Sequence, residues 1–353
     1  MDIVFLLDKL ILIVAIFAIS LGIAMYSTYF ERIFAGFFQD RVGPDRAGPW
    51  GMLQPLADGG KLFFKEEILP TNANTILFIA GPSLSMLTAC MSSAVIPWGT
   101  YLEFGDHKFG LQVTDVNIGL LYIFGVVSLG VYGIMIGGWA SNNKYSLLGA
   151  VRAASQNISY EIAMGLSVIA LIMLNGSLSL TEITVRQGGT LPFVGIQGLN
   201  WNIFYQPLGF LIFIVCAFAE CNRTPFDLPE CETELVGGYH TEYSSMKLGF
   251  YLFAEYINMF VSSAFMSVLY FGGYNFPGIG WVDANWGHNA ATILGLLVLF
   301  AKIFFFIFFF MWVRWTVPRF RYDQLMKLGW QMLIPLAILN ILITGVLVMI
   351  ANN

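Results

Sequence analysis

The chain has 353 residues, of which 57% are hydrophobic and 11% are charged, and its mean hydropathy is +0.72. Soluble domains average about 25% charged residues, so this composition excludes an ordinary soluble protein and predicts an integral membrane protein. The net charge of −5 is mild, and no basic run or low-complexity tail points to nucleic acid binding. We therefore expect a single integral membrane domain over residues 1–353.

Eight apolar segments of spanning length alternate with segments rich in Pro, Gly and charged residues. The first segment is longer than the apolar region of a signal peptide and is followed by Glu31, so we interpret it as a retained span. The pattern predicts an all-α polytopic fold with eight transmembrane helices, near residues 3–29, 74–97, 117–139, 158–176, 204–222, 247–271, 290–316 and 328–351.

Two segments between the first and second spans alternate aromatic and charged residues at helical spacing. They are FERIFAGFFQD, residues 30–40, and LADGGKLFFKEE, residues 56–67. Such a pattern predicts amphipathic helices that lie in the membrane interface. They either roof a cavity at the membrane surface or serve as plain connectors that anchor the fold.

Basic residues are unevenly distributed among the connections. The first, third, fifth and seventh connections hold thirteen of the 17 Lys and Arg residues, and the others hold only Lys108 and Arg186. The positive-inside rule then predicts that the four basic connections are cytoplasmic and that both termini are periplasmic. Lys9 and Lys302 lie inside spans, and for Lys302 we expect a buried carboxylate partner, in a structural pair or a transport role.

Three carboxylates are predicted at membrane depth. Glu161 falls near the start of the fourth span, Glu220 near the end of the fifth and Glu255 well inside the sixth. An ionisable group within a span is costly and normally faces the protein interior or a water-filled cavity, so these residues indicate a proton or ion path. For Glu161 and Glu220, a capped or ion-paired helix end is the alternative.

A loop between the fifth and sixth spans, CNRTPFDLPECETELVGGYHTEY, concentrates acid against one base, Arg223. In an extended segment its three central glutamates would share a face, whereas in a helix the first and third would align. Repulsion and partial burial are expected to raise some of the pKa values toward neutrality, with protons shared by the group. The alternative is a solvated acidic loop. Its carboxylates are Asp227, Glu230, Glu232, Glu234 and Glu242.

The seventh connection follows a Phe-rich span and is basic. We expect its side chains to reach the cytoplasmic interface, where they pair with the acidic loop or with an acidic partner protein. Its charged residues are Arg314, Arg319, Arg321, Asp323 and Lys327.

The cysteines and histidines lack the spacing of a metal or haem site. No C-x-x-C pair or Cys/His combination of zinc or iron–sulfur type is present, and we expect the histidines in loops. The sequence therefore predicts no metal ligand set on this chain. The residues are Cys90, Cys216, Cys221, Cys231, His107, His240 and His288.

Four ordered motifs, spread over the whole chain, resemble signature stretches of the H subunit of respiratory complex I, the NADH-quinone oxidoreductase, which is the counterpart of mitochondrial NADH dehydrogenase subunit 1. The motifs are FERIFAGFFQDRVGPDRAGPWGMLQPLADGGKLFFKE, SNNKYSLLGAVRAASQNISYEI, FAECNRTPFDLPECETELVGGYHTEY and RWTVPRFRYDQLM, and FAEYIN follows the third. The resemblance implies a bacterial inner-membrane protein that encloses a quinone tunnel and begins a proton path. It also implies that ubiquinone or menaquinone is the substrate, that flavin and iron–sulfur clusters lie on partner subunits, and that both membrane-arm and peripheral-arm subunits are partners.

The resemblance assigns roles to individual charged residues. Those it places around the quinone tunnel and its entrance are Glu31, Arg32, Arg41, Arg46, Asp58 and Lys61. Those it places on the proton path are Glu161, Glu220, Asp227, Glu230, Glu232, Glu234 and Glu255.

Two other functions are open at this point. The first is a homologous component of a membrane-bound hydrogenase or of a quinone reductase that is not fed by NADH. The second is a secondary cation/proton transporter with Glu161, Glu255 and Lys302 as carriers, but transporters often contain internal repeats and none is evident here. The tunnel motifs favour an NADH-quinone oxidoreductase.

Overall fold

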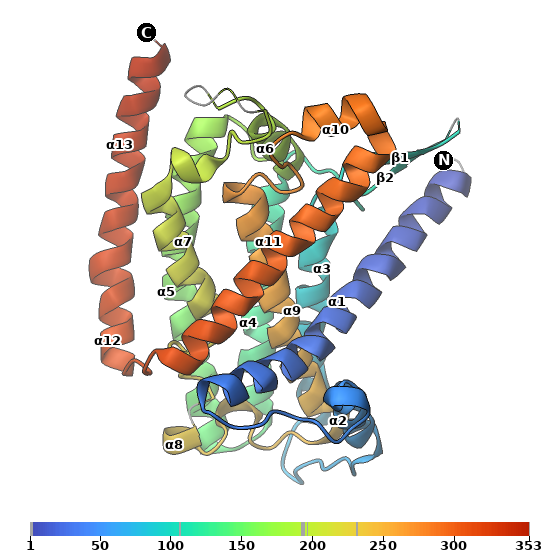
Figure 1. Ribbon diagram of the computed structural model, residues 1–353. Helices are drawn as coiled ribbons and strands as arrows, with labels where there is room; N and C mark the ends of the chain where they lie inside the picture. The colour runs from blue at the N-terminus through green and yellow to red at the C-terminus, as the bar shows by residue number, and fades with distance from the viewer. Residues whose placement is uncertain (1–2, 106, 192–194, 196, 231, 353) are drawn as a thin grey trace.

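The computed structural model describes residues 3–105, 107–191, 195, 197–230 and 232–352, which form a bundle of long helices (Figure 1). Seven segments of this part of the chain are long and apolar enough to cross a membrane. Five are single helices, one is α3 with the 3₁₀ turn that follows it, and the last joins two helices through a π-helical stretch, Leu328–Leu333. The helices are α1 (Ile3–Phe38), α3 (Thr75–Ser92), α4 (Gly119–Ala140), α5 (Lys144–Asn175), α9 (Ser245–Tyr270), α11 (His288–Thr316), α12 (Tyr322–Lys327) and α13 (Ile334–Asn352).

Shorter elements lie at the two ends of the bundle. The two strands pair antiparallel in a hairpin, with Tyr101 opposite Gly110. Short 3₁₀ turns cover Pro49–Gly51, Ser93–Val95, Asn202–Phe204 and Gly238–His240. The other elements are α2 (Gln54–Phe64), β1 (Tyr101–Phe104), β2 (His107–Gly110), α6 (Leu180–Gln187), α7 (Pro207–Glu220), α8 (Glu232–Leu235) and α10 (Ile279–Trp286).

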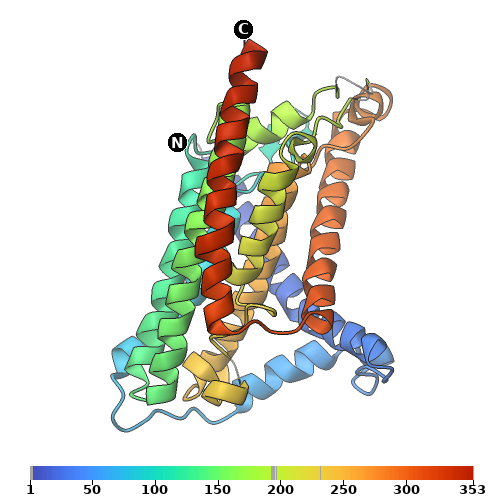
Figure 2. The ribbon, with the colours of Figure 1, turned by 90° about the vertical axis from the view of Figure 1, so that its left-hand side faces the viewer.

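The start of α1 and the end of α13 lie at the same end of the bundle, together with the hairpin, α6 and α10 (Figure 1). Helices α2, α8 and α12 lie at the opposite end, as the second view also shows (Figure 2). The four basic connections thus share one end, as their sequence pattern predicts. The end that carries α2, α8 and α12 is called the basic end below.

Helix α1 is 36 residues long, or about 54 Å at the rise of an α-helix. This length exceeds the ~30 Å hydrocarbon core, and the oblique course of α1 accommodates it (Figure 1). The prediction of a separate interfacial helix at 30–40 is wrong, because no proline interrupts the helical segment before Pro44 and α1 continues to Phe38. The second amphipathic segment does form a separate helix, α2, with Phe63 and Phe64 exposed.

Two predicted spans differ from the helices observed. Helix α7 has 14 residues and reaches only about 21 Å, so it falls short of spanning length and an eighth full span is not confirmed. After Glu220 the chain continues as a buried loop over residues 221–229, and irregular backbone at such a depth is tolerated only inside protein. Helix α5 begins at Lys144 rather than near 158, so Glu161 lies in the middle of a helix and not near its start.

Small residues let three helices approach closely. A Cβ atom added to Gly81 of α3 would lie 2.8 Å from the Cα of Gly137 in α4. On α4, the carbonyl oxygens of Gly133 and Gly137 accept hydrogen bonds from the hydroxyls of Tyr251 and Tyr243, at 3.1 and 3.2 Å. Small residues at helix contacts in membranes replace the hydrophobic driving force with close van der Waals packing. This packing fixes α9 against α3 and α4.

Buried polar side chains join α13 to α7. The Asn340 amide donates to Gln206 Oε1 at 2.9 Å, and the Gln206 amide donates to the Thr344 hydroxyl at 2.7 Å. All three residues are buried. Hydrogen bonds of this kind hold membrane helices together where apolar packing alone is weak.

Lys302 pairs with no carboxylate of the described residues, contrary to the prediction. Its ammonium donates 2.7 Å hydrogen bonds to the carbonyl oxygens of Phe271, Gly273 and Asn275, and lies 4.6 Å from the centre of the Trp201 ring. These carbonyls directly follow α9, whose C-terminus carries partial negative charge. The lysine therefore caps the end of a helix.

Candidate functional site

A buried ion-pair cluster connects α1, α9, α11 and the loop after α7. Glu31 of α1 is its centre, with a side chain only 7% exposed. It accepts a 2.6 Å hydrogen bond from the Tyr256 hydroxyl, and it pairs with Arg314 and, at 3.4 Å, with Arg223. The Arg223 guanidinium also lies 4.0 Å from the centre of the Tyr256 ring. A buried charge needs such a complete set of partners, because removing one member of a buried ion pair leaves the charge of the other member uncompensated.

Asp227, in the loop after α7, joins this cluster to the seventh connection. Its carboxylate is 7% exposed and accepts a 2.8 Å hydrogen bond from Arg319. Burial and the nearby negative charge of Glu230 raise the pKa of Asp227 to about 6, although the guanidinium of Arg319 opposes the rise. The acidic loop and the basic connection thus pair within the chain, which was one of two alternatives left open by the sequence.

A cavity of about 110 Å³ lies beside this cluster, between α1, α2 and α9. Arg32 and Asp58 form an ion pair at 2.6 Å on its lining, and Tyr256 lies on the opposite wall, next to Phe253. The rest of the lining is mainly apolar, with Met25, Pro55, Leu62 and Leu252. The other tunnel candidates lie away from this lining and are exposed; they are Arg41, Arg46 and Lys61.

Two carboxylates from distant parts of the sequence meet at a tyrosine. The Tyr239 hydroxyl lies 3.0 Å from Glu255 and 3.3 Å from Glu230, so it bridges α9 and the acidic loop. His240 Nε2 lies 3.4 Å from Glu230, and the histidine side chain is 22% exposed. This arrangement leads from a partly exposed imidazole to a carboxylate inside a membrane-spanning helix.

The charge state of the loop residues follows from these contacts. Burial alone would raise the pKa of Glu230, but hydrogen bonds with His240 and Glu255 outweigh it and lower that pKa to about 2. Burial opposes the charge of His240, yet the hydrogen bond to Glu230 and its negative charge raise the pKa of His240 above 6.5. The prediction that some of the pKa values of the acidic loop rise is confirmed at Asp227. The pKa of Glu230 is lowered instead, and the sequence does not show that His240 contacts that carboxylate.

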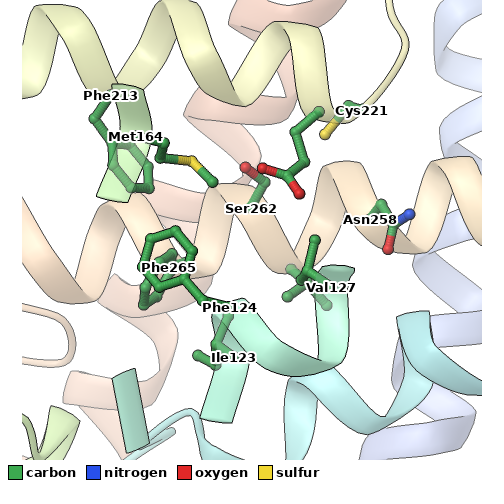
Figure 3. Close-up of a pocket in the computed structure, with 11 residues that line it drawn as sticks. Ile123, Phe124, Val127, Met164, Phe213, Cys221, Asn258, Ser262 and Phe265 are labelled. Carbon is green, nitrogen blue, oxygen red and sulfur yellow. The ribbon is translucent and has the colours of Figure 1, made fainter. Parts of the chain in front are cut away.

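Two small cavities, one polar and one mainly apolar, border Glu220, and the polar one also borders Glu255. One, of about 30 Å³, is lined by Glu255, Tyr239, Asn258, Asn157 and Glu220 among others. A second, also of about 30 Å³, borders Glu220 and is lined mainly by apolar side chains (Figure 3). Figure 3 shows Asn258 and Ser262 of α9 beside this second cavity.

Glu161 lies beyond Glu220. It accepts a hydrogen bond from the Ser128 hydroxyl of α4 and interacts electrostatically with Glu220. Of the three predicted membrane-depth carboxylates, Glu220 and Glu255 thus line one cavity, and Glu161 is close enough to Glu220 for its charge to act on it.

The remaining acidic candidates, Glu232 and Glu234, are on the short helix α8. Glu232 begins the single helical turn α8, Glu234 follows on the same turn, and Cys231 lies outside the described residues. Glu234 is 52% exposed and pairs with Arg152 at 2.7 Å. In the basic connection, Arg321 pairs with Asp323 at 3.3 Å on the surface.

The expectation that every histidine lies in a loop is wrong. His107 pairs in β2, His240 closes a 3₁₀ turn and His288 is the first residue of α11. Each lies at an element boundary, where sequence patterns define elements least well.

Comparison with known proteins agrees with this architecture. The family model described as NADH dehydrogenase matches residues 10–345. A protein of Cytophaga hutchinsonii that is named as an H subunit of NADH-quinone oxidoreductase is 66% identical over 98% of both chains. The proteins of the same name from Flavobacterium psychrophilum and Flavobacterium johnsoniae are each 64% identical, the first over 98% of both chains and the second over 99% of this chain and 97% of its own.

This chain belongs to the H-subunit family of NADH-quinone oxidoreductases. The membership confirms the resemblance found in the motifs, and the long apolar helices confirm a membrane protein.

Within this member of the H-subunit family, several site residues escaped the sequence reasoning. Tyr239 and His240 lie within the acidic loop, in the GYH triplet, and Tyr256 directly follows Glu255. Asn157 and Ser128 carry no charge and stand on apolar helices, so charge at membrane depth does not reveal them. The one signal in the sequence was the presence of hydrogen-bonding side chains next to carboxylates already singled out.

Proposed function

We propose that this chain forms the quinone chamber of a proton-translocating NADH-quinone oxidoreductase and couples quinone reduction to proton movement through its buried carboxylates. Two observations carry the proposal: Tyr256, which donates a hydrogen bond to Glu31, lines the cavity at α1, α2 and α9, and Glu255 and Glu220 share a second cavity, with Glu161 acting electrostatically on Glu220. Carboxylates in membrane-spanning helices that face such cavities are typical of proton paths.

The chamber side of the proposal is supported by the lining of the 110 Å³ cavity. Apolar walls suit an isoprenoid chain, and the Arg32 and Asp58 pair provides a polar group at the same lining. Arg41, Arg46 and Lys61 are exposed on the same end of the bundle, where they form a cationic and polar surface. We infer that this surface contacts the peripheral-arm subunits that complete the chamber.

The proton side of the proposal is supported by the polar groups between the carboxylates. The polar cavity of about 30 Å³ has room for a water molecule, which needs roughly 10–15 Å³, and water there would bridge Glu255, Asn258 and Glu220. Tyr239 supplies a hydroxyl that both accepts and donates a proton between Glu230 and Glu255. In this path, a proton moves between neighbouring groups without a free charge crossing lipid.

The coupling step follows from shared titration. Reduction of a quinone to a quinol takes up electrons and protons in equal number, so the quinol itself is neutral. The groups of the chamber that donate these protons, next to the Glu31 cluster, become more negative. Arg314 and Arg223 contact Glu31, and the charge of Arg223 also bears on Glu230. A change of charge in the Glu31 cluster therefore shifts the protonation of Glu230 and Glu255, and this shift passes along the membrane arm.

The assembly implied by this function is a bacterial inner-membrane complex. The positive-inside rule puts the basic end in the cytoplasm and both termini in the periplasm. Flavin and iron–sulfur clusters belong to partner subunits in the peripheral arm, and this chain supplies the binding walls and the proton path. Relatives at 64–66% identity are named as components of an NADH-quinone oxidoreductase, which favours this donor over a hydrogenase assembly.

The test is a Glu255→Gln substitution in the intact complex. It keeps the shape of the side chain and its hydrogen-bonding capacity but removes the titratable group, so NADH-driven quinone reduction and proton translocation are both expected to fall sharply. Reduction of a water-soluble electron acceptor by NADH should remain, because that reaction needs only the peripheral subunits. Both activities are measured in membrane vesicles.

A matched control is Glu182→Gln, which changes an exposed carboxylate on α6 at the opposite end of the bundle. It should leave both activities unchanged. Wild-type quinone reduction and proton translocation in the Glu255→Gln complex would refute the proposed path.

A further inference from the structure

A wholly apolar cavity of about 170 Å³ lies between α1 and α11, near the end of the bundle that carries both termini. It is separate from the charged cluster. Side chains of α1, α9, α11 and the hairpin region line it, among them Ile11, Ala15, Trp98, Leu111, Leu296 and Phe300.

The inner wall of this cavity is rigid. The Trp98 ring stacks on Phe260 at 5.7 Å and on Phe300 at 5.9 Å, both with nearly parallel planes. Trp98 and Phe260 are buried, whereas Ile11 and Ile19, on the α1 side of the cavity, are 54% and 42% exposed. The cavity is therefore bounded by packed aromatic rings on one side and borders the lipid-facing surface of α1 on the other.

The chemistry of the lining selects its occupant. Apolar cavities of about 150 Å³ stay free of water and bind hydrocarbons of benzene size. This cavity is of that size and borders a helix whose outer face is exposed and apolar, with Leu10 and Val14 more than half exposed. In a membrane, the hydrocarbon at hand there is a lipid acyl chain.

A cation lies at the outer edge of the cavity. Lys9 is on α1, less than one turn from Leu12 of the lining, and its ammonium donates a 2.7 Å hydrogen bond to the carbonyl oxygen of Gln112, next to Leu111. It also lies 5.5 Å from the centre of the Phe5 ring. The groups that Lys9 contacts within the described part of the chain are thus neutral, and its positive charge can attract an anion.

Among the residues that the structure describes, the other charges near this edge are already paired. His107 contacts Asp8 at 2.8 Å, and Lys108 contacts Glu103 at 3.4 Å. Lys9 is therefore the cation of this group whose charge is not offset by a carboxylate contact.

We propose that this cavity binds one acyl chain of an anionic phospholipid, with the phosphate held at Lys9. The site is distinct from the proposed quinone chamber, whose lining on α1 begins at Met25. The nearest residues of the two linings on α1, Ile19 and Met25, are six residues apart, which is about 9 Å along the helix. An acyl chain seated here fills space between α1 and α11 and so fixes the angle of α1, which also carries Glu31.

The experiment uses the intact complex in vesicles that contain phosphatidylglycerol with a photoactivatable group in its acyl chain. A phosphatidylcholine carrying the same chain is the parallel probe. After illumination, lipid adducts are mapped by peptide mass spectrometry. We expect phosphatidylglycerol adducts on residues 11–19 and 296–300, and fewer adducts there with phosphatidylcholine.

Substitutions then test the site itself. Ala15→Phe fills the cavity and should lower these adducts several-fold, whereas Ala18→Phe, at an exposed position on α1 outside the lining, should not. Leu296→Trp fills the cavity from the α11 side and provides a second, independent variant. Lys9→Gln should remove the preference for phosphatidylglycerol while keeping adducts from both lipids.

Three outcomes would overturn the proposal. The first is the absence of lipid adducts at the lining of the wild-type complex. The second is an equal adduct yield in the Ala15→Phe and Ala18→Phe complexes, which would indicate mere contact with bulk lipid. The third is loss of the adducts when a long-chain quinone is added, which would identify an isoprenoid chain as the occupant.

Discussion

Replacing Tyr239 with Phe tests the link between the acidic loop and the membrane-depth carboxylates. The hydroxyl lies 3.0 Å from Glu255 and 3.3 Å from Glu230, and the phenyl ring keeps the packing of the tyrosine. A hydrogen bond to a charged group contributes about 1.5–3 kcal/mol. Since about 1.4 kcal/mol corresponds to a tenfold change in rate, loss of this bridge is expected to slow NADH-driven quinone reduction about tenfold or more.

The assay measures quinone reduction and proton translocation in vesicles, in normal and in heavy water. A slower proton transfer should increase the solvent isotope effect on quinone reduction, which a merely structural defect would not do. Reduction of a soluble acceptor by NADH reports that the complex is assembled.

Tyr243→Phe is the matched control. The Tyr243 hydroxyl donates to the carbonyl oxygens of Phe78 and Gly137 rather than to a carboxylate. Its loss should reduce stability with little effect on the isotope effect. A Tyr239→Phe complex with the wild-type rate and isotope effect would refute the reasoning that the hydroxyl carries protons.

Three further predictions follow from the contacts described above. Lys302→Met leaves three helix-end carbonyls without their donor and should lower stability by about 1–3 kcal/mol, seen as a lower temperature of complex dissociation; loss of proton translocation at unchanged stability would contradict a capping role. The pair of His240 and Glu230 should stabilise the loop most between about pH 4.5 and 6.5. Because the pKa of His240 is raised, the stability that its charge contributes is complete below pH 6.5 and is lost as the pH rises through that pKa. Because the pKa of Glu230 is lowered, the stability that its charge contributes is complete above pH 4.5 and is lost as the pH falls toward 2. Hydrogen exchange of residues 230–243 checks this: the wild type should lose protection above pH 6.5, and His240→Gln should remove that loss. Gly137→Val puts a side chain where the Tyr251 hydroxyl lies, so it should disrupt assembly, whereas a valine at Gly125, an exposed position of the same helix with open space beside it, should be tolerated; normal assembly of the Gly137→Val complex would show that α4 and α9 separate easily.

The amino-acid sequence by itself determined the membrane character, the helical class and the family. Long apolar segments have one stable solution in lipid, the helix, because each backbone group must be hydrogen-bonded within the segment. Side assignment by Lys and Arg also grouped the four basic connections correctly at one end. These properties depend on composition and order along the chain.

The ends of helices α5 and α7 and the partners of Lys302 were decided only by the tertiary structure. Helix α7 stops at Glu220 because the loop after it is buried among neighbouring helices, where irregular backbone is protected. The start of α5 was missed because the residues after Lys144 include Gly and Ala, whose burial against other elements cannot be read from hydropathy. Lys302 found helix-end carbonyls rather than an acid, since its partner depends on where α9 ends.

The carboxylates of the site were visible in the sequence, but their connections were not. Glu31 and Arg314 are 283 residues apart, and only the packing of α1 on α11 brings them into contact. Likewise, the path of the loop places the Tyr239 hydroxyl against Glu255 and His240 against Glu230, so the fold decides which carboxylate pairs with the imidazole. The identity of an ionisable residue follows from the sequence, whereas its protonation depends on neighbours that only the folded chain provides.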